Sequence, residues 1–232
     1  MIAQNPMGHV IAIDGPAGAG KSTIARRVAE RLGYTYIDTG AMYRAVALWA
    51  TRENVALDDS HRLEQLALAA EIGLLPGRRV TLNGEDVTDA IRTPEASAAA
   101  SKVAAIGLVR TALVKRQRRL AESVSVVMEG RDIGTVVFPD ARVKIFLDAD
   151  PQERVRRRAG EQNEVPSGDL AAQLAARDRR DRERTESPLV QAPDAVYLDS
   201  TGLSPEEVEE AILGLVRARI SNGKPDTRKE AV

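Results

Sequence analysis

The chain has no cysteine and only two histidines, His9 and His61, among its 232 residues. The absence of cysteine excludes disulfides and thiolate metal sites. The two histidines are too few and too far apart to indicate a zinc site, so we expect both on the surface. No apolar run approaches the roughly 20 residues that span a bilayer, and residues 1–9 lack the charged start and apolar stretch of a signal peptide. These absences predict a cytoplasmic protein without a membrane segment.

An excess of charge of either sign is also lacking, because 33 Lys and Arg residues are balanced by 34 Asp and Glu residues. A chain this close to neutral has no overall field that attracts nucleic acid or a membrane, so anion binding has to come from local clusters. Hydrophobic residues make up 43% and charged residues 29%, which is ordinary for a soluble enzyme. The length suffices for one α/β core with inserted lobes.

Residues 15–22 are the most informative segment, since they fit the phosphate-binding pattern G-x-x-x-x-G-K-[ST]. The apolar residues 10–14 before them predict a short buried strand, and residues 22–32 after them predict a helix. Strand, glycine loop and helix in this order form the context of a phosphate-binding loop. The alternative is a glycine-rich turn without a ligand, and it does not explain why all three features agree.

Each residue type in this loop suits the binding of phosphate. Gly15, Gly18 and Gly20 allow backbone conformations that a side chain would forbid, so successive amides can surround one anion. Lys21 offers a positive charge to the β- and γ-phosphates of a nucleoside triphosphate, and Ser22 offers a hydroxyl to Mg²⁺. The helix N-terminus adds its positive end. The expected nucleotide-binding residues are Gly15, Pro16, Ala17, Gly18, Ala19, Gly20, Lys21, Ser22 and Thr23.

Four further apolar runs predict buried parallel strands. They are residues 34–38, 124–128, 143–148 and 195–199. Helical patterns separate them, so right-handed crossovers give a doubly wound parallel sheet of five strands. Ligands of such sheets bind at the carboxyl ends of the strands. The polar residues expected there are Asp14, 38–39, 129–132 and Asp148.

Two segments interrupt this alternation. Residues 80–87 carry Asn83-Gly84 between short β-type runs, which predicts a small antiparallel insert outside the parallel sheet. Residues 151–158 begin with proline and carry four arginines, which predicts a helix, and a polar loop is expected at 160–168. Such an arginine-bearing helix and loop are typical of a mobile lid. The polar residues 221–232 predict a disordered tail.

Two arginine-containing segments are candidate binding sites. Gly130-Arg131-Asp132-Ile133-Gly134 directly follows a predicted strand, where ligands bind, although a turn held by an internal ion pair is the alternative. Within residues 177–184, Arg177, Asp181 and Arg184 have the spacing of one helix face, which could hold phosphate and a ribose hydroxyl. From residue types alone a solvated helix with i,i+4 ion pairs is favoured. Nucleic-acid binding is disfavoured, because acidic residues are interleaved and aromatic residues are absent there.

Taken together, these segments resemble the bacterial cytidylate kinase family from residue 10 to about residue 219. The run Gly-Arg-Asp-Ile-Gly-Thr-Val-Val-Phe-Pro-Asp at 130–140 and the insert are far more specific than the phosphate loop. The other resembling segments are residues 13–22, 38–44, 84–87, 91–93, 143–148, 177–184 and 187–189.

The resemblance implies the fold of P-loop nucleoside monophosphate kinases. This is a five-stranded parallel sheet flanked by helices, with an antiparallel insert in the monophosphate-binding lobe and a short lid. It implies one kinase unit over residues 1–222. Its expected parts are a core at 8–37, 113–150 and 169–222, a monophosphate-binding lobe at 38–112, a lid at 151–168 and a disordered tail at 223–232.

The resemblance also implies transfer of a phosphoryl group from ATP to CMP or dCMP with Mg²⁺ held at Ser22, in a monomer that binds neither nucleic acid nor membrane. Asp132 matches the family's cytosine-reading carboxylate, which suits the amino group at N4. Arg44 and Arg131 match cations near the acceptor phosphate. The catalytic residues expected from the resemblance are Lys21, Arg131 and the lid residues Arg154 and Arg158, with the two lid arginines at the transferring phosphoryl group. The implied substrate contacts are Thr39, Arg44, Ser101, Arg110, Arg131, Asp132, Arg177, Asp181 and Arg184, with Ser101 and Arg110 on the helix after the insert.

Three positions or segments depart from the family pattern. Many members have glycine at the position of Ser22 and some have serine at the position of Thr39, while the lid residues 159–168 differ more widely. Two other functions stay open. A kinase for UMP, AMP or shikimate would share the phosphate loop, but would not need Asp132 beside Arg110. A nucleotide-dependent switch would turn over a triphosphate without CMP.

Overall fold

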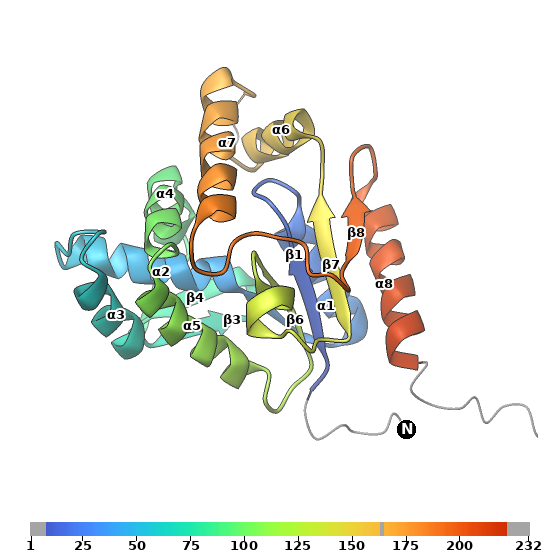
Figure 1. Cartoon of the computed structure of the whole chain (residues 1–232), viewed down its shortest axis with the longest axis horizontal. Coiled ribbons are helices and arrows are strands. Elements are labelled where there is room, and N and C mark those ends of the chain that lie inside the picture. The colour runs from blue at the N-terminus through green and yellow to red at the C-terminus, as the bar shows by residue number, and fades with distance from the viewer. Residues whose placement is uncertain (1–7, 163–164, 222–232) are drawn as a thin grey trace, which may run out of the picture.

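A parallel sheet forms the centre of the protein, in a computed structural model that describes residues 8–162 and 165–221 (Figure 1). Its five strands lie in the order β2-β6-β1-β7-β8, and every neighbouring pair is parallel. The predicted five-stranded parallel sheet is therefore confirmed. The strands are β1 (Val10–Asp14), β2 (Thr35–Asp38), β6 (Val126–Gly130), β7 (Val143–Asp148) and β8 (Val196–Asp199).

The predicted bounds of β6 are wrong by two residues. The strand begins at Val126 instead of Val124 and continues through Glu129 and Gly130. The apolar Val124 favoured an earlier start, but it lies 42% exposed, and pairing with both β1 and β2 starts only at Val126. The shift brings the carboxylate of Glu129 into the buried end of the strand.

Helices and a π-helical turn cover the two faces of the sheet. On one face α1 (Lys21–Leu32) and α8 (Pro205–Ser221) pack over buried isoleucines that include Ile13 and Ile145. On the other face the π-helix Ile133–Val137 (η3) and α5 (Gly107–Leu120) pack over Met128. Because both faces are buried, the strands are nearly continuous apolar runs.

A second group of elements lies beside the central sheet, on the left in Figure 1. It contains the antiparallel sheet β3-β4-β5, which confirms the predicted insert. Asn83 and Gly84 connect β4 to β5 with φ of 51° and 86°, the left-handed conformations that a two-residue hairpin turn requires. The elements are α2 (Thr39–Arg52), α3 (Ser60–Ala69), β3 (Ile72–Leu75), the 3₁₀ turn Pro76–Arg78, β4 (Arg79–Leu82), β5 (Glu85–Asp86), the 3₁₀ turn Ala90–Arg92 and α4 (Pro94–Val103).

The segment after the insert forms two helices, so the expectation of one helix that carries both Ser101 and Arg110 is wrong. Ser101 lies on α4 and Arg110 lies on α5, and the two helices meet at 101°. The break occurs because Ile106 adopts an extended conformation directly before Gly107. The bend turns Ser101 and Arg110 toward the same cavity.

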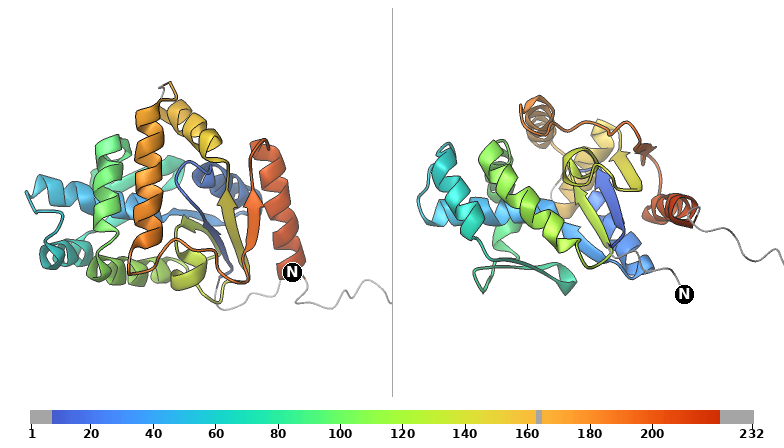
Figure 2. Two further views of the ribbon diagram at one scale, coloured as in Figure 1. Left: turned by 45° about the horizontal axis from the view of Figure 1, so that its top comes forward. Right: turned by 60° about the horizontal axis from the view of Figure 1, so that its bottom comes forward.

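Two helices between β7 and β8 stand above the carboxyl ends of the strands, as Figures 1 and 2 show. They are α6 (Pro151–Gln162) and α7 (Gly168–Glu183). The helix predicted from residue 151 is present, but it runs through residues 160–162, where a loop was expected. The disordered tail predicted from residue 221 starts too early by one residue, because Ser221 is the last residue of α8, and the rest of that segment lies outside the described residues. Over the residues that are described, no single helix is long and apolar enough to cross a membrane; the bent pair α4 and α5 passes that test only when both helices are counted together.

Candidate active site

The loop at residues 15–22 has the backbone of a phosphate-binding loop. Gly18 and Gly20 have φ of 77° and 85°, and α1 begins directly afterwards at Lys21. A Cβ on Gly15 would lie 1.9 Å from the carbonyl oxygen of Leu147 on β7. Glycine is therefore required both for the turn and for the close approach to the sheet. The ammonium of Lys21 reaches back to the carbonyl oxygen of Pro16 at 2.6 Å.

A buried ion pair holds this loop from the side of α6 and α7. Arg154 of α6 is bonded to Asp178 of α7, and both side chains are at least nine-tenths buried. Asp178 accepts the amide of Ala17 at 3.2 Å, and Arg154 donates to the carbonyl oxygen of the same residue at 3.1 Å. Arg154, which was expected at the transferring phosphoryl group, thus braces the loop here.

The buried carboxylate of Glu129 faces the start of α1 from the end of β6. It accepts a hydrogen bond of 2.5 Å from the hydroxyl of Tyr36, and Ser22 lies within hydrogen-bonding reach. Burial, with the nearby charge of Asp38, raises the pKa of Glu129. Burial, with the nearby charge of Arg131, lowers the pKa of Lys21 to about 7.

At the other end of the site, Asp132 is held between two arginines. Arg110 of α5 is bonded to one carboxylate oxygen, and Nη2 of Arg184 lies 3.8 Å from the other. The guanidinium of Arg110 also lies over the ring of Tyr43, 5.5 Å from its centre, a cation–π contact. Asp132 is only 5% exposed, so its carboxylate is paired with these arginines away from solvent.

Between the two ends lies a row of cations. Arg131 donates to Asp181 at 2.8 Å, and Arg44 donates to Asp38 at 2.8 Å. The side chain of Arg177 is buried beside Arg131 and Asp181, and burial lowers its pKa to about 9. Arg177, Asp181 and Arg184 were predicted to share one helix face. Arg177 and Asp181 lie on α7, but Arg184 is the first residue after the helix.

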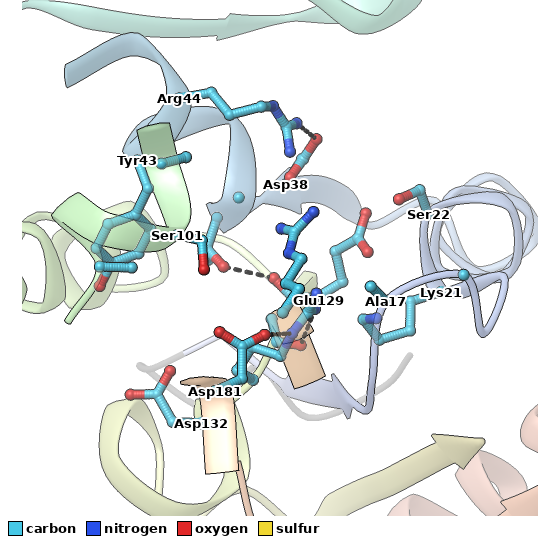
Figure 3. A pocket seen from close by; sticks show the side chains of 18 of the residues that line it. Ala17, Lys21, Ser22, Asp38, Tyr43, Arg44, Ser101, Glu129, Asp132 and Asp181 are labelled. Carbon is cyan, nitrogen blue, oxygen red and sulfur yellow. Dashed lines mark hydrogen bonds and ion pairs between the residues drawn. The ribbon is translucent and has the colours of Figure 1, made fainter. Parts of the chain in front are cut away.

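One cavity of about 140 Å³ joins these groups. Figure 3 shows Lys21 and Asp132 on its opposite sides, with Glu129 and Asp181 between them. From the phosphate loop it takes the residues Ala17, Gly18, Gly20, Lys21 and Ser22. The other predicted site residues that line it are Thr39, Arg44, Ser101, Arg110, Arg131, Asp132, Arg158, Arg177, Asp181 and Arg184. Arg154, Gly15, Pro16, Ala19 and Thr23 do not line it.

A second hollow of about 310 Å³ adjoins the loop. It is lined by Ala19, Gly20 and Thr23, and its apolar wall includes Leu203 and Pro205. The phosphate loop therefore lies between two spaces: this hollow on one side, and the cavity that contains Asp132 on the other.

Some residues of the site were not assigned from the sequence. Glu129 and Asp38 were placed at the ends of strands, yet no role was given to them, because their partners come from other elements. Tyr43 is one helical turn after Thr39 and lies within a resembling segment, which is the signal that could have found it. Asp178 was hidden in an arginine-rich run, and its bond to Ala17 joins positions 161 residues apart.

Four arginines that line this cavity each have a buried guanidinium nitrogen without a hydrogen-bond partner within residues 8–162 and 165–221. They are Arg44, Arg110, Arg177 and Arg184. Buried donors without partners are costly and rare in folded proteins, so this cavity is built for ligands that carry acceptor oxygens. The described residues contain no cluster of three or more acidic, histidine or cysteine side chains for a metal, and Mg²⁺ at phosphate sites commonly needs only one or two protein ligands.

A phosphate-binding loop at the carboxyl end of a parallel sheet, facing a cavity lined by arginines, defines a P-loop kinase. The family model described as cytidylate kinase matches residues 11–218. The chain therefore belongs to the cytidylate kinase family.

The sequences of curated cytidylate kinases are similar to this chain over nearly its whole length. The chain is 64% identical to a cytidylate kinase of Solibacter usitatus over 93% of this chain and 95% of that protein. It is 50% identical to a cytidylate kinase of Geobacter sulfurreducens over 94% and 97% of the two chains. A crystal structure of an uncharacterized protein from Eubacterium ventriosum is 13% identical, with a TM-score of 0.52 over 91% of this chain and 99% of that chain. This last likeness concerns the fold alone.

Proposed function

We propose that the protein transfers the γ-phosphoryl group of ATP to CMP and to dCMP, giving ADP and CDP or dCDP. The observation that carries this proposal is the buried carboxylate of Asp132, held by Arg110 across the cavity from Lys21. In this proposal ATP binds at the phosphate loop and the adjoining hollow, and the acceptor binds in the cavity that contains Asp132.

Recognition of cytosine follows from the chemistry around Asp132. Cytosine presents an amino donor at N4 and acceptors at N3 and O2. The Asp132 carboxylate accepts from N4, while Arg110 and Arg184 supply donors. Uracil has a carbonyl oxygen at the position of N4, which would face a carboxylate without a proton between them. A good pair of this kind discriminates by about 1–3 kcal/mol.

The row of cations suits the phosphate and the ribose of the acceptor. Arg44, Arg131 and Arg177 line the cavity between its two ends. The Nε atoms of Arg44 and Arg177 have no acceptor among the described residues and can donate to phosphate oxygens. Asp181 can accept a ribose hydroxyl while it holds Arg131. Several other contacts do not involve the 2′-hydroxyl, so dCMP is also a substrate.

The donor side combines the phosphate loop with the second hollow. Lys21 and the loop amides bind the β- and γ-phosphates, and the hollow beside Thr23 takes the nucleoside. The hydroxyl of Ser22 and the carboxylate of Glu129 lie together and are oxygen ligands of the kind that Mg²⁺ prefers. When bound, Mg²⁺ neutralises charge on the phosphate oxygens.

The reaction needs no general base, because the acceptor is already an anion. Lys21 and the arginines offset the repulsion between two phosphates and hold them in line. We propose residues 38–112 as the monophosphate-binding lobe and 151–168 as a lid, which would close over both substrates and exclude water. Arg158 already lines the cavity, whereas Arg154 would have to exchange Asp178 for phosphate. The enzyme is proposed to act as a cytoplasmic monomer.

An acceptor panel tests this proposal. The rates with CMP, dCMP, UMP and AMP are compared at fixed ATP and Mg²⁺. We expect kcat/KM for CMP to exceed that for UMP by about tenfold or more. Asp132→Asn should shift the preference toward UMP, because an amide can donate to its carbonyl oxygen, while the exposed Asp140→Asn is the matched control. Equal rates for all four acceptors would contradict the proposal.

A second assay separates a kinase from a nucleotide-dependent switch. ADP release is measured with and without CMP. We expect release to depend on CMP, and to be lost in Lys21→Met. Steady ADP release without an acceptor, or near-normal phosphorylation of CMP by Lys21→Met, would rule the kinase mechanism out.

A further inference from the structure

The π-helix η3 follows Asp132 directly, and its first amides are held by a carboxylate from another strand. Asp14, the last residue of β1, accepts the amide of Ile133 at 2.8 Å and that of Gly134 at 2.7 Å. Asp14 is 5% exposed. Each of its two oxygens therefore bonds one amide in a buried setting, where hydrogen bonds to a charged group are strong.

The other end of the π-helix and the residues after it are held by basic side chains, opposite in charge to Asp14. Arg118 of α5 donates to the carbonyl oxygens of Val137 at 2.9 Å and Val136 at 2.8 Å. Lys144 of β7 is bonded to the carbonyl oxygen of Pro139. The turn thus has an acidic side chain, Asp14, at its amides and a basic side chain, Arg118, at its carbonyls, which matches the dipole of a helical turn, while Lys144 holds the chain two residues beyond it.

Asp132 lies at the junction between β6 and this turn. A Cβ on Gly134 would lie 3.1 Å from Lys144 and 3.4 Å from the carboxylate of Asp14, so the turn has little space to shift toward the sheet. Since the amide of the next residue is fixed by Asp14, the backbone from which Asp132 projects is fixed as well. The conformation of Asp132 itself is irregular, with φ of -147° and ψ of 23°.

We infer that Asp14 is a positioning residue that sets the orientation of Asp132 and thereby the choice of acceptor base. This inference rests on the proposed reading of cytosine by Asp132. Asp14 also directly precedes the phosphate loop, yet within the described part of the chain its carboxylate is bonded to Ile133 and Gly134 and to no residue of that loop. The strand that ends in the donor loop therefore also sets the selectivity on the acceptor side.

The test is Asp14→Asn, which keeps the shape but can accept only through one oxygen. Steady-state kinetics are measured with CMP and UMP at saturating ATP, and with ATP at saturating CMP. We expect the ratio of kcat/KM for CMP over UMP to fall by about tenfold, the effect of roughly 1.4 kcal/mol, from the loss of one charge-assisted hydrogen bond. The KM for ATP should change by less than about twofold, because the donor loop keeps its own contacts.

The matched control is Arg118→Gln, which loosens the same turn from its far end. This exposed side chain has two bonds to the turn, as Asp14 has. We expect Arg118→Gln to lower thermal stability while the CMP to UMP ratio stays near that of the wild type. Equal losses of selectivity in both variants would show that Asp14 only stabilises the turn. A raised KM for ATP in Asp14→Asn with unchanged selectivity would show that Asp14 acts on the donor loop. Each of these two results overturns the inference.

Two further measurements keep the test decisive. If Asp14→Asn does not fold, Asp14→Ser, a small acceptor of one amide, is assayed with the same expectation, and retained selectivity there overturns the inference. The selectivity of the wild type shows whether the proposed reading of cytosine by Asp132 or only the role of Asp14 is wrong. A wild type without preference for CMP refutes the reading of cytosine, whereas a selective wild type with an equally selective Asp14→Asn refutes only the role of Asp14.

Discussion

The Nε of Arg131 donates to Oδ2 of Asp181 at 2.8 Å, and both side chains line the active-site cavity. In the proposed mechanism Arg131 contacts the acceptor phosphate and Asp181 contacts the ribose. The bond therefore ties two contacts to the same substrate molecule into one unit, so the loss of either partner disturbs both.

Asp181→Asn should lower kcat/KM for CMP about 10- to 100-fold, because a buried arginine loses its charged partner, an effect of about 1.4–3 kcal/mol. The loss for dCMP should be smaller, since dCMP has no 2′-hydroxyl for Asp181 to accept. Kinetics with both acceptors measure the two losses, with the exposed Glu183→Gln on the same helix as control. Equal losses for CMP and dCMP would remove Asp181 from ribose recognition.

Binding of ATP should take up protons at pH 8. In the free enzyme the pKa of Lys21 is about 7, below the value of 10.5 for a free lysine, so its amine is mostly neutral at pH 8. The negative triphosphate favours the ammonium, and up to about one proton should bind with each ATP. Titration calorimetry without Mg²⁺ in two buffers of different ionisation enthalpy measures this uptake. Lys21→Met should show none, and proton release by the wild type would contradict the assignment.

Asp178→Asn should destabilise the protein strongly. The substitution leaves the buried guanidinium of Arg154 without its charged partner, and breaking such a pair costs about 3–5 kcal/mol. Urea unfolding measures the change. Arg156→Gln on α6 is the control: it removes an arginine from an exposed ion pair with Glu153, and the unfolding midpoint should stay where it is. A stable Asp178→Asn protein with normal affinity for ATP would show that the loop needs no brace.

Asp14 should make stability depend on pH in a defined direction. Burial raises its pKa from 3.8 to about 6, so between these values the folded protein holds a proton that the unfolded chain releases. The contribution of Asp14 to stability therefore grows as the pH falls through 6 and declines as the pH rises. The stability of the wild type relative to Asp14→Asn should increase by about 1 kcal/mol from pH 7 to pH 5. Urea unfolding of both proteins at the two pH values tests this, and a decrease would refute the assigned pKa.

The features that were predictable from the sequence are those that local pattern determines. The phosphate loop and five strands follow from glycine spacing and apolar runs, and the hairpin follows from Asn83-Gly84, whose left-handed conformations few residues adopt. Helical spacing also predicted that Arg177 and Asp181 share a face, and both line the cavity.

The features that were missed depend on packing between distant segments. The family resemblance places Arg154 at the transferring phosphoryl group, and nothing in its local sequence indicates the contacts that it makes in this structure. Its actual partners, Asp178 and the carbonyl oxygen of Ala17, are set by how α6 and α7 pack on the loop. In the same way the start of β6 is decided by pairing with two neighbouring strands, and the break between α4 and α5 by the backbone of Ile106. None of these is visible in a local run of residues.

Helix α7 is bonded to both sides of the site within one helical turn. Asp178 is bonded to the donor loop and Asp181 to Arg131 on the acceptor side, while Arg180 reaches Ser101 on α4. A rigid helix cannot release one of these contacts and move without straining the others. If the donor displaces α7, then the two binding equilibria are coupled, and the factor by which ATP alters the affinity for CMP must equal the factor by which CMP alters the affinity for ATP.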